Sequence, residues 1–132
     1  MFRLVKILNG RTNQGEPIRL PTGSRTYEIG EALLLDAGEA VQCGDDEKPE
    51  FICCEDKTFK SSTGNTILAM PISPDMIFEV PVSESPEALI PGVKVTLCDC
   101  VGVTATTENG VATVVSTCGA SSAGDKIQVC FK

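Results

Sequence analysis

The sequence predicts an all-β protein: a small β-barrel or sandwich built from two similar β-units, with an extended N-terminal arm. Three observations support this fold. Short runs alternate apolar and polar residues with the period of a strand, turn residues separate the runs, and a segment recurs at an offset of sixty residues. The 132 residues, 42% of them hydrophobic and 22% charged, suit about one soluble globular domain.

Each expected strand is a short run rich in β-branched or aromatic residues between Gly, Pro, Asn or Asp. Alternation is clearest in 92–98, where Val93, Val95 and Leu97 share one face. The only helical candidate, 84–89, is expected to form a single turn. The expected strands are 2–8, 17–20, 26–29, 31–35, 39–43, 50–54, 65–70, 76–82, 92–98, 102–107, 111–116 and 126–131.

One turn predicts a specific pairing. Asn109-Gly110 separates two β-branched runs, and Asn-Gly is typical of a two-residue hairpin turn. The runs 102–107 and 111–116 are therefore expected to pair.

An internal repeat aligns residues 51–72 with 111–132 without a gap. The identities are Ser61/Ser121, Ser62/Ser122, Gly64/Gly124 and Ile67/Ile127. Upstream, the pattern Gly-x4-Leu recurs at an offset of sixty-two, from Gly30 and from Gly92. Because the apolar positions stay in phase, we expect 65–70 and 126–131 to occupy equivalent places in two related units.

Charge divides the chain into a basic N-terminal arm, 1–25, and a single β domain, 26–132. The first segment carries a net charge of +4 and the remainder −11. Its arginines and apolar residues are candidates for a partner interface, because Arg holds carboxylates through two hydrogen bonds. The alternative, packing of the arm on its own acidic body, stays open. The candidate residues are Phe2, Arg3, Leu4, Arg11, Ile18, Arg19, Leu20 and Arg25.

Composition excludes several classes of function. The chain has no histidine, which removes imidazole metal ligands and the commonest general base. No catalytic constellation is found, so we expect no enzyme and no cofactor. The net charge of −7 disfavours a nucleic-acid partner, and no apolar run is long enough for a membrane span. The chain has few aromatic residues and no Trp, which argues against a site that binds sugars or bases by stacking.

Seven cysteines, an odd number, stand at 43, 53, 54, 98, 100, 118 and 130. The start of the chain is not typical of a secretory signal, so free thiols in a reducing compartment are the simplest interpretation. The alternatives are disulfides, or a metal site of Cys98, Cys100, Cys118 and Cys130. That spacing lacks the C-x2-C pairs of zinc sites. We therefore expect at least four free thiols and no bound metal.

The C-terminal run from Pro91 to Lys132 carries a resemblance. Gly110-Val111-Ala112 and the segment 123–127 (AGDKI) resemble tailed-phage head decoration (cement) proteins and related structural β-barrel proteins of prophages. The resemblance covers about residues 28–132, and the seven cysteines depart from the family's pattern.

This resemblance implies a structural protein, made in the bacterial cytoplasm, that binds and stabilises the outside of a phage capsid. It implies the major capsid protein as partner and a homo-oligomer, often a trimer, on the virion surface. The alternatives are a β-barrel module of a phage tail or a cell-surface carbohydrate-binding domain. A thiol enzyme is disfavoured by the missing histidine.

Overall fold

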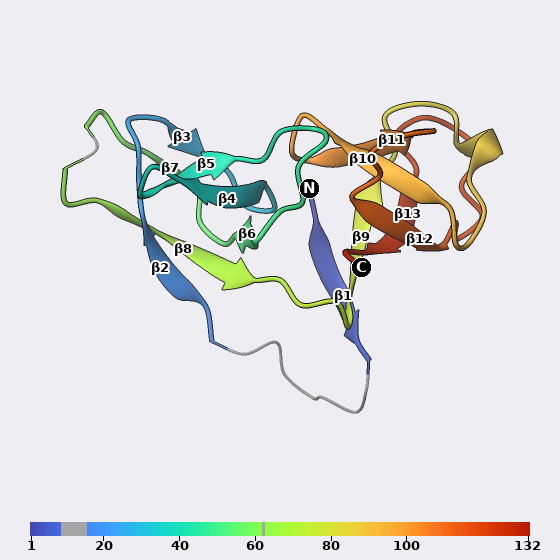
Figure 1. Cartoon of the computed structure of the whole chain (residues 1–132), viewed down its shortest axis with the longest axis horizontal. Helices are drawn as coiled ribbons and strands as arrows, with labels where there is room; N and C mark the ends of the chain where they lie inside the picture. Colours follow the sequence, from blue (N-terminus) through green and yellow to red (C-terminus); the bar gives the residue numbers. More distant parts are fainter. Residues whose placement is uncertain (9–15, 62) are drawn as a thin grey trace.

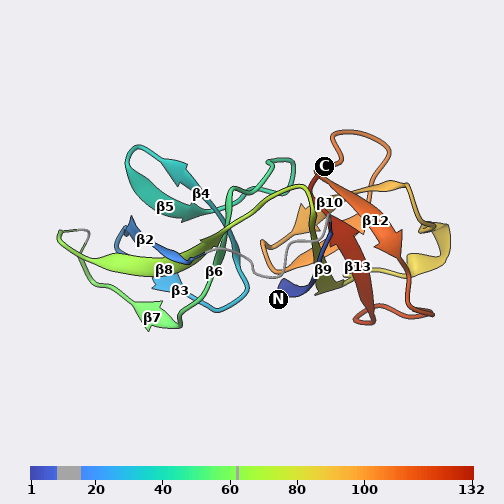
Figure 2. The same cartoon turned by 90° about the horizontal axis from the view of Figure 1, so that it is seen from below.

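The computed structural model describes residues 1–8, 16–61 and 63–132. The fold is all-β, with 2% of the residues helical and 47% in strands, as predicted. Two β-units lie side by side along the long axis of the molecule (Figures 1 and 2). Apart from its first strand, which pairs with the second unit, the chain completes the first unit before it forms the second.

Each of the twelve expected runs overlaps a strand, and the expected turn at 84–89 is the 3-10 turn η1 (Pro86–Ala88). The sequence did not predict β7, which has two exposed residues and no apolar pattern. The strands are β1 (Arg3–Ile7), β2 (Ile18–Pro21), β3 (Thr26–Tyr27), β4 (Ala32–Asp36), β5 (Glu39–Gln42), β6 (Phe51–Cys53), β7 (Lys57–Thr58), β8 (Thr66–Pro71), β9 (Met76–Pro81), β10 (Lys94–Cys98), β11 (Gly102–Ala105), β12 (Ala112–Ser116) and β13 (Lys126–Cys130).

These strands form three antiparallel sheets. The first unit is a five-stranded sheet in the order β2-β8-β6-β4-β5, with a small β3-β7 ribbon beside it. The second unit is a six-stranded sheet in the order β1-β9-β13-β12-β10-β11. In the first unit a single parallel bridge joins Thr22, at the end of β2, to Ala40 of β5, and in the second unit a single parallel bridge joins Val82, at the end of β9, to Val103 of β11. Each sheet is therefore curled rather than flat.

The two units share one topology. Without β1, the second sheet reads β9-β13-β12-β10-β11, which matches β2-β8-β6-β4-β5 strand for strand in the same chain order. The registers match as well. Ile18 pairs with Ala69 as Phe78 pairs with Val129. The predicted repeat is confirmed, because β8 and β13 occupy equivalent places at an offset of sixty.

The gapless alignment is wrong by one residue for one strand pair. Cys53 pairs with Ala69, and Val114 pairs with Val129, so β6 corresponds to β12 at an offset of sixty-one. The difference lies in the shorter connection from β12 to β13. The offset of sixty-two seen at Gly30 and Gly92 holds for β4 and β10, and both glycines have positive φ, 84° and 96°.

The hairpin expected at Asn109-Gly110 does not form. β10 lies between β11 and β12 and pairs with both. A type I′ turn needs positive φ at both central residues; Asn109 has φ 52°, but Gly110 is not among the positive-φ glycines. The chain instead crosses beside Lys94, whose Cβ would lie 2.3 Å from a Cβ at Gly110. A two-residue turn with both φ positive occurs at Ala37-Gly38, between β4 and β5.

The larger hydrophobic core crosses the boundary between the units. It joins Ala32, Ile52 and Met70 of the first unit to Phe78 and many residues of the second. A smaller core, around Tyr27, Leu33 and Ile67, lies within the first unit. Since the main core is shared, the units are packed as one body.

The N-terminal segment is extended, but its described strands pair with the body. β1 pairs with β9 of the second unit, and β2 pairs with β8 of the first. Phe2 lies in the main core, with ring centroids 6.4 Å from Phe78 and 5.5 Å from Phe131. The described residues before 26 are therefore part of the folded body.

This placement predicts that Phe2→Ala destabilises the protein by about 3–5 kcal/mol, the usual cost of truncating a buried Phe. The measurement is urea unfolding followed by circular dichroism. Ile90→Ala is the control, because Ile90 is 61% exposed and its loss should change stability by less than about 0.5 kcal/mol. Equal stability of the two variants would show that β1 is not docked.

Candidate protein-binding surface

Two of the eight predicted interface residues belong to the chain's own core. Phe2 and Leu20 are each 3% exposed, because both lie on the inner face of the strand segment that carries them. The expectation that they anchor a partner is therefore corrected. Leu4 is half-buried and packs against the main core. Arg11 lies outside the described residues.

The other predicted arginines contact the body, which favours the alternative left open above. Arg3 forms an ion pair with Glu79 at 2.8 Å, and Arg19 approaches Glu55 at 3.6 Å. The guanidinium of Arg25 lies 5.4 Å from the centre of the Tyr27 ring. Nevertheless, the Arg3 and Arg19 side chains remain 61% and 54% exposed, and such surface pairs contribute little to stability. Both arginines are available to a second carboxylate.

The exposed members lie on edge strands. β1 and β2 are terminal strands of their sheets, so each has one side without a complete ladder of backbone partners. Ile18 on β2 is 42% exposed, and Val5 on β1 is 37% exposed. Sequence reasoning missed Val5, which lies at a break in the β1–β9 register between Leu4 and Lys6. Arg3, Val5, Ile18 and Arg19 form what we call the N-terminal edge residues.

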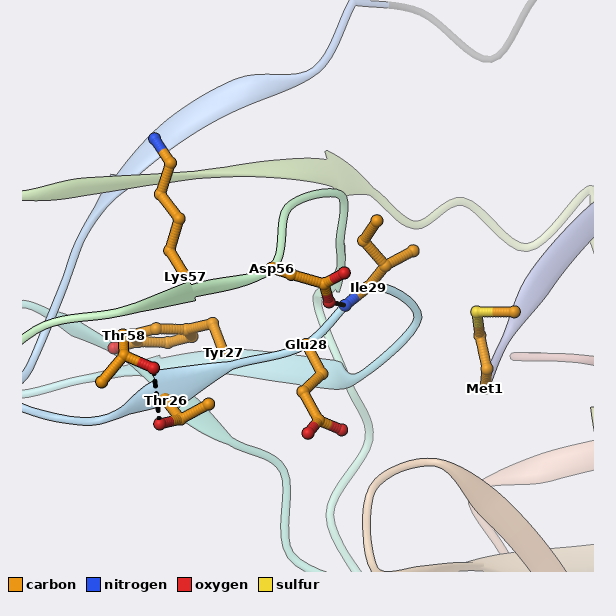
Figure 3. Close-up of a pocket in the computed structure, with 8 residues that line it drawn as sticks. All are labelled: Met1, Thr26, Tyr27, Glu28, Ile29, Asp56, Lys57 and Thr58. Atoms are coloured by element: carbon orange, nitrogen blue, oxygen red, sulfur yellow. Dashed lines mark hydrogen bonds between the residues drawn. The ribbon is translucent and has the colours of Figure 1, made fainter.

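A shallow hollow of about 710 Å³ lies between the β3-β7 ribbon and Met1 (Figure 3). Several of its polar groups bond to other groups of the protein. Asp56 accepts a hydrogen bond from the Ile29 amide at 2.7 Å, and the Thr26 and Thr58 hydroxyls bond each other at 2.9 Å. In Figure 3 the Lys57 and Glu28 side chains point in opposite directions. The lining groups therefore do not converge on a ligand.

All seven cysteines are free thiols. Burial, reinforced by nearby carboxylates, raises the pKa of Cys43 and Cys100 to about 12. Burial likewise raises the pKa of Cys53 to about 11. A thiol acts as nucleophile or metal ligand only as the thiolate, so these three are inert at neutral pH. Cys118 is exposed.

Two further searches cover the described part of the chain. Within residues 1–8, 16–61 and 63–132, no three His, Cys, Asp or Glu side chains are grouped so as to hold a metal ion. No helix among these residues has the length and apolar character needed to cross a membrane.

The chain matches no protein-family model, and no curated protein is found to be similar to it. The two units of the chain can, however, be compared with each other over their five matching strands. In that comparison Arg19 of β2 corresponds to Glu79 of β9, and Ile18 corresponds to Phe78.

Thiol reactivity should follow burial. In native protein at pH 8, iodoacetamide is expected to modify Cys118 first, while Cys43, Cys53 and Cys100 react only after unfolding. Peptide mass spectrometry at timed intervals measures the order. Cys118→Ser should abolish the fast phase, and rapid native labelling of Cys43 or Cys100 would contradict the burial.

Stability should fall at alkaline pH. Cys43 and Cys100 are neutral in the folded state up to about pH 12, whereas their ordinary pKa is 9.0. The unfolded state therefore loses protons first, and stability falls as pH rises from about 9 toward 12. Urea midpoints at pH 7.5 and 10.5 test this. Cys100→Ala should reduce the difference between the two midpoints, and Ile90→Ala, which removes no ionisable group from an exposed position, should leave that difference unchanged.

Proposed function

We propose that this protein is a structural virion protein that binds and stabilises the outside of a phage capsid. The observation that carries the proposal is a duplicated all-β body whose N-terminal edge strands carry exposed arginine and apolar side chains. A cement protein needs a stable body and a binding edge rather than a reaction centre. The partner proposed is the major capsid protein, and the assembled form a homotrimer on the virion surface.

The residues behind the resemblance build a turn in the second unit. The Asp125 carboxylate accepts hydrogen bonds from the amides of Ser121 at 2.9 Å and Ser122 at 3.1 Å. These bonds lower the pKa of Asp125. The Gly124 amide, at φ 89°, donates to the Val82 carbonyl at 2.7 Å. The shared motif thus serves the fold, and binding falls to other residues.

Binding of many copies to one capsid would allow each copy to bind through a small edge surface. A standard interface covers roughly 800 Å² on each partner, a small part of this protein's accessible surface of 6818 Å². Many copies on a symmetric lattice, each bound through a modest patch, still cover the shell firmly when copies also contact one another. Oligomerisation therefore belongs to the same proposal.

The carbohydrate-binding alternative has less support. Sugar and base stacking need an exposed aromatic face, whereas Phe2, Tyr27, Phe78 and Phe131 are buried and Phe51 and Phe59 are half-buried. A phage-tail module would use the same body and edges as a decoration protein. The experiment below separates tail from capsid by offering both particles.

Capsid binding is expected to be specific, salt-sensitive and dependent on Arg19. The full chain is mixed with expanded capsids, unexpanded capsids and isolated tails of the phage that encodes it, and co-sedimentation is measured. Binding to capsids should weaken with salt, because exposed charges are screened within about 8–10 Å. Arg19→Glu should weaken binding roughly fivefold or more. Lys60→Glu, an exposed charge reversal away from the N-terminal edge residues, is the matched control.

Two outcomes would overturn this proposal: binding to tails alone, or no binding to either capsid form. Point substitutions are preferred to deletion of 1–25. Deletion would remove β1, β2 and the buried Phe2 and Leu20, so loss of binding would only report unfolding.

A further inference from the structure

The internal duplication exposes a difference between the units. On β9, the side away from β13 carries strand β1, visible beside β9 in Figures 1 and 2. β2 is the counterpart of β9, and its side away from β8 carries no paired strand within the described residues. The second unit therefore shows how a strand would dock on the first.

The β1–β9 contact supplies the geometry. Arg3 lies opposite Glu79 and Leu4 opposite Phe78, and the Arg3–Glu79 ion pair closes at 2.8 Å. β1 uses only the segment 76–79 of β9, and the parallel bridge to β11 lies farther along, at Val82. β9 therefore pairs with β1 over one part of its length and forms the parallel bridge to β11 beyond it. On β2 the corresponding bridge is at Thr22, and no described strand pairs with the outer side of β2 at Ile18 and Arg19.

The corresponding residues Phe78 of β9 and Ile18 of β2 differ in how far they are exposed. Phe78, covered by Phe2 of the docked segment, is 0% exposed, whereas its counterpart Ile18 is 42% exposed. An apolar side chain at an inward-facing strand position is normally covered, because its burial is favourable. Ile18 thus has the place of a core residue but lacks the cover that Phe78 has.

We propose that the β2 edge, meaning Ile18 and Arg19, docks an extended strand of a partner protein. That strand carries an apolar residue opposite Ile18 and an acidic residue opposite Arg19. β-strand addition of this kind gains affinity from main-chain hydrogen bonds and specificity from alternate side chains. The inference holds for any protein that supplies the strand, so it does not depend on the capsid proposal.

The charge of Arg19 determines which kind of strand can pair with β2. Glu79 of β9 faces Arg3, but the corresponding residue of β2 is Arg19. The β1 strand of a second copy would place Arg3 opposite Arg19, and like charges directly opposite each other destabilise a strand pair. The edge therefore fits an acidic strand from a different protein.

Arg19 can turn to a partner at little cost. Its contact with Glu55 is long, 3.6 Å. Glu55 retains the Lys57 ammonium at 3.4 Å and the Leu68 amide at 3.1 Å without it. The Arg19 fork is thus free to hold a new carboxylate through two hydrogen bonds.

The test uses two fluorescein-labelled peptides with the sequence of residues 1–8, one unchanged and one with Arg3→Glu. Fluorescence anisotropy with the full-length protein should show the Arg3→Glu peptide binding at least about fivefold more tightly, because an attractive exposed charge pair replaces a repulsive one of similar size. Arg19→Glu in the protein should reverse this order, and Lys60→Glu should leave it unchanged. Circular dichroism of each variant establishes that it is folded.

Amide hydrogen exchange locates the contact. Bound peptide should protect residues 18–20 and leave 76–79 unchanged. Three outcomes would overturn the proposal: no binding of either peptide at millimolar concentration, an order that does not depend on residue 19, or displacement of β1 from β9. Light scattering tests whether a second copy occupies the edge instead, since self-association that Arg19→Glu strengthens or weakens would assign the edge to a second copy. No capsid is used, so failure here leaves the capsid experiment intact.

Discussion

Three consecutive residues, Gly30 to Ala32, connect the parts of this molecule. The Gly30 carbonyl accepts the Phe2 amide at 2.9 Å, and the Gly30 amide donates to Cys53 at 2.8 Å. The Ala32 amide donates to Cys100 of the second unit at 2.8 Å. Gly30 has φ 84°, and a Cβ there would come within 1.9 Å of Met1. The N-terminal segment and both units therefore meet at a point that only glycine fits readily.

The shared core explains why the first strand crosses to the second unit. Five short strands give each unit little more than fifty residues, and domains of that size bury a smaller fraction of their surface on folding than larger domains do. Phe2 fills the space beside Phe78 and Phe131, so the start of the chain completes the core of its second half. This crossing makes the fold one cooperative body, and it gives the two units different edges.

The sequence predicted the strands because period-two alternation and turn residues are local signals. Pairing was harder to predict. The Asn109-Gly110 turn depends on φ at Gly110, which is not positive, and Gly110 packs closely beside Lys94 of another strand. β7 is too short and exposed to leave a pattern. Phe2 and Leu20 were assigned to a partner because charge segregation indicated an arm, although their inward-facing positions matter more. The β2 edge, which no described strand covers, could be recognised only when the registers of the two units were compared.

An edge strand can pair with strands of other molecules and cause aggregation. On β2, prolines at both ends limit the length over which such pairing can occur. Pro17 precedes β2 and Pro21 ends it, and proline has no N–H to donate to a neighbouring strand. β9 ends in Pro81 in the same way, and β1 stops short of it, at Glu79. Two prolines and the charge of Arg19 thus limit pairing at β2 to a short strand of suitable charge, which is what separates a docking edge from an aggregation site.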